Sequence, residues 1–202
     1  MSFWENTRKP VGLGGKLMVS LMNLGHSPVA WWGLRFLNVA PDAKVLDCGC
    51  GGGANIKRLL KKCPQGIVKG IDYSPVSVEK SQRVNADAIA KGRCTILQGS
   101  VAKRIFAEGW FDAVTAFETV YFWPELPQCF HEIHRMLKPG GMFLICNESS
   151  GDTDKDEKWT KIIDGMTIYK DVELKADLEQ AGFREVQIHK NKWGWLCVTA
   201  RK

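Results

Sequence analysis

The 202-residue chain lacks the features of membrane, secreted and repetitive proteins. It has no apolar run close to the roughly 20 residues that a membrane-spanning helix needs. Its first residues lack the positive stretch and long apolar core of a secretion signal. No internal repeat or low-complexity tract interrupts the sequence. We therefore expect a cytoplasmic protein with no membrane span, large enough to bury a sizeable core.

The cysteines lack the even number and regular spacing of a disulfide framework. Seven of them are scattered along a chain that is long enough to fold without covalent links. Thiols in such a chain are typically reduced, as they are in the cytoplasm. We expect no disulfide bonds.

Positive charge exceeds negative charge but is not gathered into one segment. The formal net charge is +6, and lysines and arginines occur along the whole chain. The densest group, Lys57-Arg58 with Lys61-Lys62, falls where the solvated face of a helix is predicted. An acidic partner is one interpretation of a basic protein, but this diffuse pattern does not favour nucleic acid.

Residues 1–42 are predicted to form a helical leader ahead of the main domain. Leucines recur there at helical spacing, and Ser27-Pro28 is typical of an N-cap followed by proline at the first helical position. Val29 and Phe36 continue one apolar face. The main domain is predicted to cover residues 43–202.

Short apolar runs alternate with segments of helical periodicity from residue 43 onward, as in α/β proteins. Strands are predicted at residues 43–49, 66–72, 94–99, 111–118 and 141–148, and helices at 54–63, 75–91, 125–137 and 171–181. Alternation with short connections predicts a doubly wound parallel sheet that is covered by helices on both faces.

The last two predicted strands, residues 183–190 and 194–200, are separated only by a turn near Trp193-Gly194. A connection this short permits only antiparallel pairing, because a parallel return needs a crossover. The predicted fold is therefore a seven-stranded, mostly parallel sheet with an antiparallel terminal strand.

A glycine-rich turn joins the first predicted strand to the first predicted helix of the main domain. Gly49, Gly51 and Gly53 would let a nucleotide approach the backbone, and the helix that follows offers amide donors at its N-terminus. The segment also fits the dinucleotide fingerprint, with Ala54 in the place of its last glycine. The glycines alone leave the choice of nucleotide open.

Two carboxylates near this turn bear on that choice. Asp72 ends the second predicted strand, where an acidic side chain accepts hydrogen bonds from ribose hydroxyls in either kind of cofactor. Asp47 stands two residues before Gly49. A negative charge there repels a pyrophosphate and attracts a ligand with ammonium and sulfonium groups. The pair therefore favours a cationic nucleoside over NAD.

Four segments resemble, in order and spacing, the motifs of class I S-adenosylmethionine-dependent methyltransferases. They are VLDCGCGGG (residues 45–53), GIDYSP (70–75), FDAVTAFETVYFWP (111–124) and MLKPGGMFLICNE (136–148). The resemblance covers residues 43–202 and implies a Rossmann-like seven-stranded sheet. The antiparallel terminal pair, which the short last connection predicted independently, agrees with this sheet. It also implies S-adenosyl-L-methionine as the cofactor.

The resemblance implies a place for each part of this cofactor. The glycine loop would hold the methionine part and Asp72 the ribose, and the adjacent Tyr73 is a further candidate cofactor-binding residue. Ser100 and Val101, after the third strand, would contact the adenine. Many members of the family carry an acidic residue where this chain has Ser100.

Residues after the fourth predicted strand are candidates for contact with the methyl acceptor, because ligands bind at the carboxyl edge of such a sheet. Glu118 and Tyr121 are candidate catalytic residues, with cofactor anchoring as the alternative role for Glu118. The ring of Phe117 or Tyr121 could face a sulfonium. The alternative is that these aromatic residues, with Trp123, belong to the core.

Two segments are predicted to cover that edge as lids. One is the helical leader, where His26 is a candidate base or substrate-orienting residue and an ordinary surface histidine is the alternative. The other is residues 157–169, which carry Trp159, Met166 and Tyr169. These lids favour an acceptor that is partly apolar or aromatic.

No metal site is predicted. Cys48 and Cys50 are close in sequence, but a tetrahedral site needs about four ligands and no neighbouring motif supplies the others. Packing as small apolar residues is the favoured interpretation. The HEIH segment (residues 131–134) is one residue short of a zinc motif. The acidic segment that begins at Asp152 lacks the glycine and the final glutamate of a calcium loop.

The sequence therefore predicts an enzyme that transfers a methyl group from S-adenosyl-L-methionine to a small-molecule acceptor by direct in-line displacement, as a monomer or homodimer. The sulfonium already activates the methyl group, so positioning and exclusion of water can supply much of the catalysis. The alternatives are an RNA-modifying enzyme of the same fold, a cofactor-binding regulatory protein without catalysis, and an NAD-dependent oxidoreductase.

Overall fold

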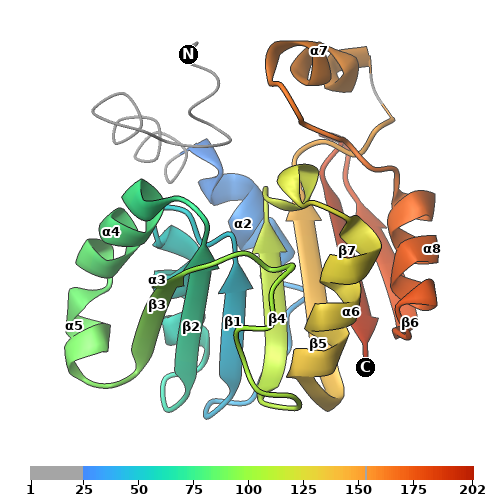
Figure 1. Ribbon diagram of the computed structural model, residues 1–202. Helices are drawn as coiled ribbons and strands as arrows, with labels where there is room; N and C mark the ends of the chain where they lie inside the picture. Colours follow the sequence, from blue (N-terminus) through green and yellow to red (C-terminus); the bar gives the residue numbers. More distant parts are fainter. Residues whose placement is uncertain (1–24, 153) are drawn as a thin grey trace.

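The computed structural model describes residues 25–152 and 154–202, in which seven strands form one sheet in the order β3-β2-β1-β4-β5-β7-β6 (Figure 1). Strands β1 to β5 are parallel, β7 is antiparallel to β5, and β6 is antiparallel to β7. The predicted sheet with its antiparallel terminal strand is confirmed. The strands are β1 Lys44–Cys48, β2 Ile67–Asp72, β3 Cys94–Gln98, β4 Phe111–Phe117, β5 Leu137–Asn147, β6 Arg184–Lys190 and β7 Leu196–Arg201.

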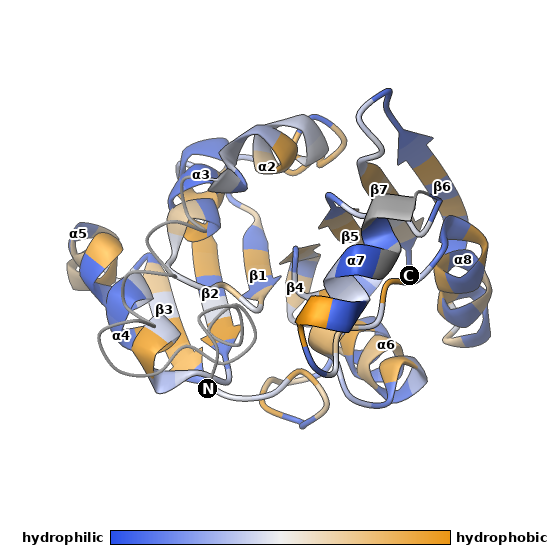
Figure 2. Cartoon of the chain, turned by 90° about the horizontal axis from the view of Figure 1, so that it is seen from above, coloured by the Kyte–Doolittle hydropathy of each residue, from blue (hydrophilic) through white to orange (hydrophobic). Residues whose placement is uncertain are grey.

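Helices cover both faces of the sheet. Figure 2, which looks down on the sheet from above, shows α2 and α3 on one side of the strands and α6 and α8 on the other. The polar residues of these helices lie largely on their outer faces, as amphipathic helices on a sheet require. The helices are α2 Ser27–Gly33, α3 Ala54–Lys62, α4 Pro75–Val84, α5 Ala86–Ala90, the 3₁₀ turn η2 Val120–Phe122, α6 Leu126–Met136, α7 Asp154–Ile162 and α8 Asp171–Gln180.

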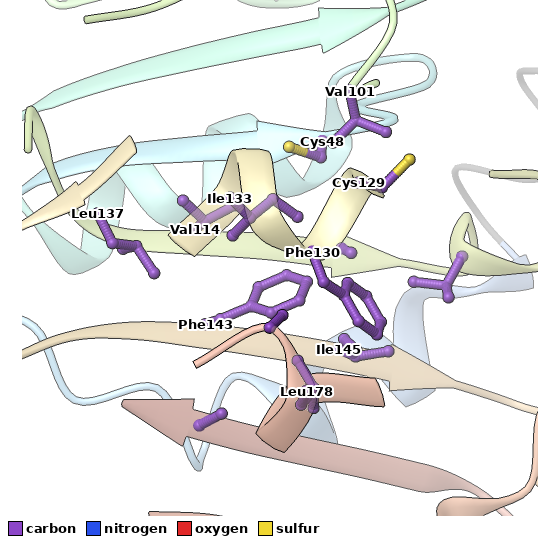
Figure 3. Packing of buried hydrophobic residues seen from close by; sticks show 14 of the residues in the cluster. Cys48, Val101, Val114, Cys129, Phe130, Ile133, Leu137, Phe143, Ile145 and Leu178 are labelled. Atoms are coloured by element: carbon purple, nitrogen blue, oxygen red, sulfur yellow. The ribbon is translucent and has the colours of Figure 1, made fainter. Parts of the chain in front are cut away.

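Alternate residues of the strands fill two separate cores. Along β5, Phe143 and Ile145 belong to the apolar cluster under α6 and α8, whereas Leu144 and Cys146 belong to the cluster under α2 and α3. Figure 3 shows the first of these clusters, where Phe130 of α6 packs edge-on against Phe143 with ring centroids 5.7 Å apart. Burial on both faces explains why residues 142–146 of β5 form a continuous apolar run.

The part of the leader that the structure describes is anchored on the sheet. Val29, Ala30 and Leu34 are buried in the cluster that α2 shares with α3. The approach is close, because a Cβ atom on Gly33 would lie 2.4 Å from the Cys146 Sγ. The leucines predicted to form the first leader helix lie outside the described residues, and the boundary at residue 42 stays a prediction.

Two predicted elements differ from the observed ones for identifiable reasons. The single helix predicted at residues 75–91 is divided into α4 and α5 at Asn85, whose side-chain amide donates to the carbonyls of Gly53 (3.0 Å) and Ser81 (2.9 Å). β5 begins four residues earlier than predicted, at Leu137, which pairs with Phe111 ahead of a register shift.

The order of the strands places the ligand-binding edge at β1 and β4. The chain moves outward from β1 to β3 and then returns to place β4 on the other side of β1. Ligands of such sheets bind outside the carboxyl ends of the strands at this reversal. This edge is uppermost in Figure 1, with α7 above it. Of the helices that the structure describes, none combines the length and apolar character that crossing a bilayer requires.

Candidate active site

The glycine loop between β1 and α3 is held in place by backbone hydrogen bonds to β2. The amides of Gly49 and Cys50 both donate to the Ile71 carbonyl, at 2.8 and 3.0 Å. Gly49 has a φ of +73°, and a Cβ atom there would lie 2.1 Å from the Thr119 Oγ1. Only glycine fits both the left-handed backbone and the close approach of the segment that follows β4.

Gly51 and Gly53 have different surroundings. A Cβ atom on Gly53 would meet Ser81 and Asn85 of the neighbouring helix region, whereas one on Gly51 would meet no atom within 4 Å. Gly53 therefore allows α3 to pack closely against α4. Gly51 faces open space, which leaves its backbone accessible to a ligand.

A cavity of about 420 Å³ lies above this loop. It extends from the glycine loop across the ends of β2 and β3 to the segment after β4. Nine of the twelve residues predicted to bind cofactor or act in catalysis line it: His26, Gly49, Gly51, Asp72, Tyr73, Ser100, Val101, Phe117 and Glu118. The other three, Asp47, Gly53 and Tyr121, are not among the lining residues.

Asp72 connects the glycine loop to the end of β2. Its carboxylate accepts hydrogen bonds from the backbone amides of Gly51 and Ser74, each at 2.9 Å. Burial raises the pKa of Asp72, and these two hydrogen bonds oppose the shift. The carboxylate at the end of β2 therefore both lines the cavity and orders the loop.

Asp47 lies beneath the loop and is almost completely buried. Its Oδ1 accepts a hydrogen bond of 2.7 Å from the Thr115 hydroxyl. The pKa of Asp47 is raised to about 7, mainly by burial. The Thr115 hydrogen bond and the charge of Arg58 lower the pKa, whereas the charge of Asp72 raises it further. Asp47 thus acts on the cavity through the electrostatic field and not through direct contact with its surface.

Arg58 is a lining residue that the sequence analysis placed wrongly on a solvated helix face. Its guanidinium donates hydrogen bonds to Asn55 Oδ1 (2.7 Å) and to the Ser27 hydroxyl. The Cζ atom of the guanidinium lies 5.5 Å from the centre of the Trp31 ring. Lys57, Lys61 and Lys62 are exposed, as predicted. The signal in the sequence was the position of Arg58, which flanks the buried stripe of α3.

Glu118 lies at the other end of the cavity in an unusual conformation. Its φ is +56°, which non-glycine residues rarely adopt and which occurs at functional sites. The carboxylate accepts hydrogen bonds from the Glu148 amide and from the Tyr121 hydroxyl. Burial raises its pKa well above the ordinary range, and the nearby charge of Glu148 adds to the shift. The left-handed turn directs the chain from β4 into η2.

Tyr121 supports this end of the cavity from behind. Its hydroxyl accepts a hydrogen bond of 3.0 Å from the Ser149 amide, and its own carbonyl accepts one of 2.9 Å from the Thr167 amide. The side chain is buried. Tyr121 therefore connects the ends of β4 and β5 to residues 157–169, the segment predicted as a second lid.

The aromatic residues at this end divide between the cavity and the core. Phe117 and Phe122 line the cavity. Trp123 also lines it, yet its ring stacks on Phe143 of the core at 6.4 Å and its indole N–H donates to the Thr119 hydroxyl at 3.2 Å. Trp123 therefore belongs both to the wall of the cavity and to the core.

His26 precedes α2 and lines the cavity from the side of the leader. Burial lowers the pKa of its imidazole. One ligating atom from each of His26, Glu118 and Glu148 lies within 4.8 Å of the others. These three residues are far apart in the sequence, and Glu148 and Arg58 are the two charged residues of the site that the sequence analysis missed.

Cys48 and Cys50 are both buried, as the packing interpretation required. Cys48 belongs to the core under α6, whereas the Cys50 thiol lies 3.7 Å from the Ser81 hydroxyl on the opposite side of the sheet. Burial raises the pKa of both thiols well above the ordinary range. Both therefore stay protonated and pack as small apolar side chains.

A comparison with protein families matches residues 46–145 to the methyltransferase domain family. The match covers the glycine loop, the acidic end of β2 and the segment after β4, and thus the residues that line the cavity apart from His26 and Val29. Together with the order of the strands, it assigns the chain to the class I S-adenosylmethionine-dependent methyltransferases, whose cofactor is S-adenosyl-L-methionine.

Curated relatives and solved structures agree with this assignment. Cycloartenol-C-24-methyltransferase of Arabidopsis thaliana is 30% identical over 162 residues, which cover 74% of this chain and 47% of that protein. The chain spans less than half the length of the curated sterol methyltransferases that it matches.

Two solved structures share the fold over most of the chain. A methyltransferase from Aquifex aeolicus has a TM-score of 0.76 at 18% identity and covers 92% of this chain and 97% of its own. An O-methyltransferase family protein from Burkholderia thailandensis has a TM-score of 0.84 at 15% identity, over 100% of this chain and 64% of its own. At these identities the likeness concerns the fold alone.

Proposed function

We propose that this chain methylates a small-molecule acceptor with S-adenosyl-L-methionine as the methyl donor. The observation that carries the proposal is the connection between Gly51 and Asp72. The amide of the accessible glycine is held by the carboxylate at the end of β2, so that an open backbone and an acidic group share one wall of the cavity.

The residues present fit the chemical groups of this cofactor. Asp72 would accept hydrogen bonds from ribose hydroxyls, and the exposed ring of Tyr73 and the Ser100 hydroxyl would border the adenine. Arg58 would pair with the methionine carboxylate. Asp47 would favour the cationic groups from beneath the loop, because opposite charges attract strongly where water is excluded.

The acceptor would enter between Glu118, His26 and the aromatic residues of the post-β4 segment. When bound, the cofactor supplies an electrophilic methyl group on a positively charged sulfur. The chain supplies a wall of Phe117, Phe122 and Trp123 that excludes water and favours positive charge. The low pKa of His26 keeps its imidazole neutral near pH 7 and able to accept a proton from the acceptor.

The acceptor class follows from the same lining. Aromatic residues on one side and two polar residues on the other favour a molecule with an apolar body and one protic group. The sterol methyltransferases among the relatives are consistent with an apolar body. Cytoplasmic location and a monomeric or homodimeric state stay predictions from the sequence.

Two measurements test the proposal. Calorimetry should show saturable binding of S-adenosyl-L-methionine and S-adenosylhomocysteine to the purified chain. Incubation with methyl-labelled cofactor and a lysate of the source cells, separated afterwards into small-molecule and RNA fractions, should then label a low-molecular-weight compound. Binding of neither nucleoside would overturn the assignment of the cavity, whereas binding with label only in RNA would favour the RNA-modifying alternative.

A further inference from the structure

Three side chains with metal-ligating atoms meet at the acceptor end of the cavity. His26 comes from the start of α2, Glu118 from the end of β4, and Glu148 follows the last residue of β5. One ligating atom from each lies within 4.8 Å of the other two. Residues separated by 92 and 30 positions in the sequence are thus brought to one point by the sheet and the leader helix.

No positive side chain balances the two carboxylates in the part of the chain that the structure describes. Each of the ion pairs found among residues 25–152 and 154–202 uses other acidic groups, such as Asp112, Glu132 and Asp152. When both are ionised, two carboxylates this close repel each other where water is partly excluded. A bound cation would remove that repulsion.

The geometry points to a binding site for a divalent first-row metal ion, held by His26, Glu118 and Glu148. One imidazole nitrogen with two carboxylate oxygens suits Zn²⁺ or Mn²⁺, which accept this mixture of ligands. Three atoms bound to one such ion, with bonds of about 2.0–2.2 Å, lie about 3–3.8 Å from one another. The ligating atoms, which lie within 4.8 Å of one another, would therefore have to move closer by rotation of their side chains when the ion binds.

The surroundings of the three residues suit a site with open coordination positions. Three protein ligands leave room for a water or substrate atom, as in catalytic metal sites. His26 and Glu118 line the cavity, so those positions open toward it. Glu118 is oriented by the Tyr121 hydroxyl and the Glu148 amide, and such partners fix the direction of a ligating group.

This inference deepens the proposed function, on which its catalytic meaning rests: the ion would hold an oxygen atom of the acceptor at the end of the cavity. A metal lowers the pKa of a bound hydroxyl. With His26 bound to the ion and no longer free to act as the base of the proposed function, the hydroxyl proton would pass to solvent. The oxygen would form its bond to the methyl carbon as the carbon–sulfur bond breaks. The acceptor class would then be a hydroxyl-bearing small molecule.

Metal binding can be measured without any acceptor. After treatment with a chelator and dialysis, the purified chain is titrated with MnCl₂ while the electron paramagnetic resonance signal of free Mn²⁺ is recorded, and ZnCl₂ is added as a competitor. We expect one Mn²⁺ per chain, displaced by Zn²⁺. Glu148→Gln and His26→Gln should each weaken binding at least about 100-fold, because loss of a direct ligand exceeds the 10–100-fold effect of an outer partner.

Matched variants separate this site from general surface binding. Glu108 and His131 are exposed and lie outside the cavity, so Glu108→Gln and His131→Gln should bind Mn²⁺ as the unchanged protein does. Saturable binding that survives both Glu148→Gln and His26→Gln, or no saturable binding below about 1 mM, would overturn the site.

Calorimetry with S-adenosylhomocysteine on the same samples reports on folding and on the proposed function separately. The expected result is cofactor affinity within about twofold of the unchanged protein in Glu148→Gln, which would show that the variant is folded. Cofactor binding without Mn²⁺ binding would remove the metal site and leave the proposed function intact. Mn²⁺ binding without cofactor binding would remove the proposed function and leave the metal site intact.

Discussion

The two ends of the cavity are built from different kinds of groups. At the cofactor end, backbone amides, glycines and the Asp72 carboxylate are joined by hydrogen bonds within one continuous β-loop-helix unit and its neighbouring strand. At the acceptor end, His26, Glu118 and Glu148 come from three separate elements. The first end is local in sequence, whereas the second exists only because the sheet and the leader bring distant residues together.

The largest effect should come from the glycine with the closest contact. Gly49→Ala places a Cβ atom 2.1 Å from the Thr119 Oγ1 in a left-handed backbone, so the loop must move and the two ends of the cavity separate. We expect cofactor affinity to fall at least about 100-fold and unfolding free energy to fall by about 2–3 kcal/mol. Calorimetry and urea unfolding measure the two effects.

Gly109→Ala is the matched control for that change. Gly109 also has a left-handed φ, of +60°, but a Cβ atom there would meet nothing within 4 Å. The Gly109→Ala variant should lose only the roughly 1–2 kcal/mol of unfolding free energy that a left-handed backbone costs a residue with a Cβ atom. It should bind the cofactor as the unchanged protein does. Equal losses of cofactor affinity in both variants would contradict a specific role for the Gly49 contact.

The second prediction concerns Asp72. Asp72→Asn keeps the shape but replaces one acceptor oxygen by a donor, so either Gly51 or Ser74 loses the partner of its amide. We expect a 30- to 100-fold loss of cofactor affinity, about 2–3 kcal/mol, from this unpaired amide and the weaker contact with ribose hydroxyls. Calorimetry with S-adenosylhomocysteine measures it, and an unchanged affinity would remove Asp72 from the cofactor site.

The third prediction separates the acceptor end from the cofactor end. Tyr121→Phe removes the hydroxyl that contacts Glu118 and accepts the Ser149 amide. Transfer of label to the small-molecule fraction of the lysate should slow about tenfold, while cofactor affinity changes less than twofold, because the cofactor end lies elsewhere in the cavity. A parallel loss of cofactor affinity would show that the two ends are not independent.

The last prediction concerns the pH dependence that Asp47 confers. Its pKa of about 7 exceeds its ordinary value of 3.8, so the folded chain binds a proton that the unfolded chain has released between roughly pH 4 and 7. The stability contributed by Asp47 therefore falls as the pH rises through this window. A cationic ligand prefers the ionised form, so cofactor affinity should rise by up to about tenfold per pH unit below pH 7 and level off above it.

Asp47→Asn tests both halves of this prediction. The variant should be more stable than the unchanged protein at pH 8, because it removes a buried charge, and should bind the cofactor more weakly there. Its affinity should no longer change between pH 6 and 8. Urea unfolding and calorimetry at the two pH values give the comparison, and an affinity profile as steep as that of the unchanged protein would assign the titration to another group.

The contrast between the two ends also explains what the sequence could predict. The period of apolar residues and the short last connection were sufficient to predict a mostly parallel sheet and its antiparallel terminal strand, but not the order of the strands. The cofactor loop was predictable because its spacing is local. The positions of Glu148 and Arg58 were not predictable, because only the register of β5 beside β4 brings Glu148 close to Glu118, and only the rotation of α3 turns Arg58 toward the cavity.

The structure also distinguished residues that the sequence grouped together. Asp47 and Gly53 belong to the same motif as Gly49 and Gly51, yet they support the loop from beneath and from the side of α4. A motif gives the positions that a loop needs without saying which of them face the ligand. Burial and packing against Thr115 and Asn85 decide that.

The central claim is that the acidic groups around the glycine loop select a cationic nucleoside over a dinucleotide. Calorimetry of the unchanged protein and Asp47→Asn with S-adenosylhomocysteine, S-adenosyl-L-methionine and NAD tests it most directly. We expect both adenosyl compounds to bind, NAD to bind at least about 100-fold more weakly, and the variant to lose affinity most for the sulfonium compound. Tight binding of NAD, or a gain in S-adenosyl-L-methionine affinity on neutralising Asp47, would contradict the claim.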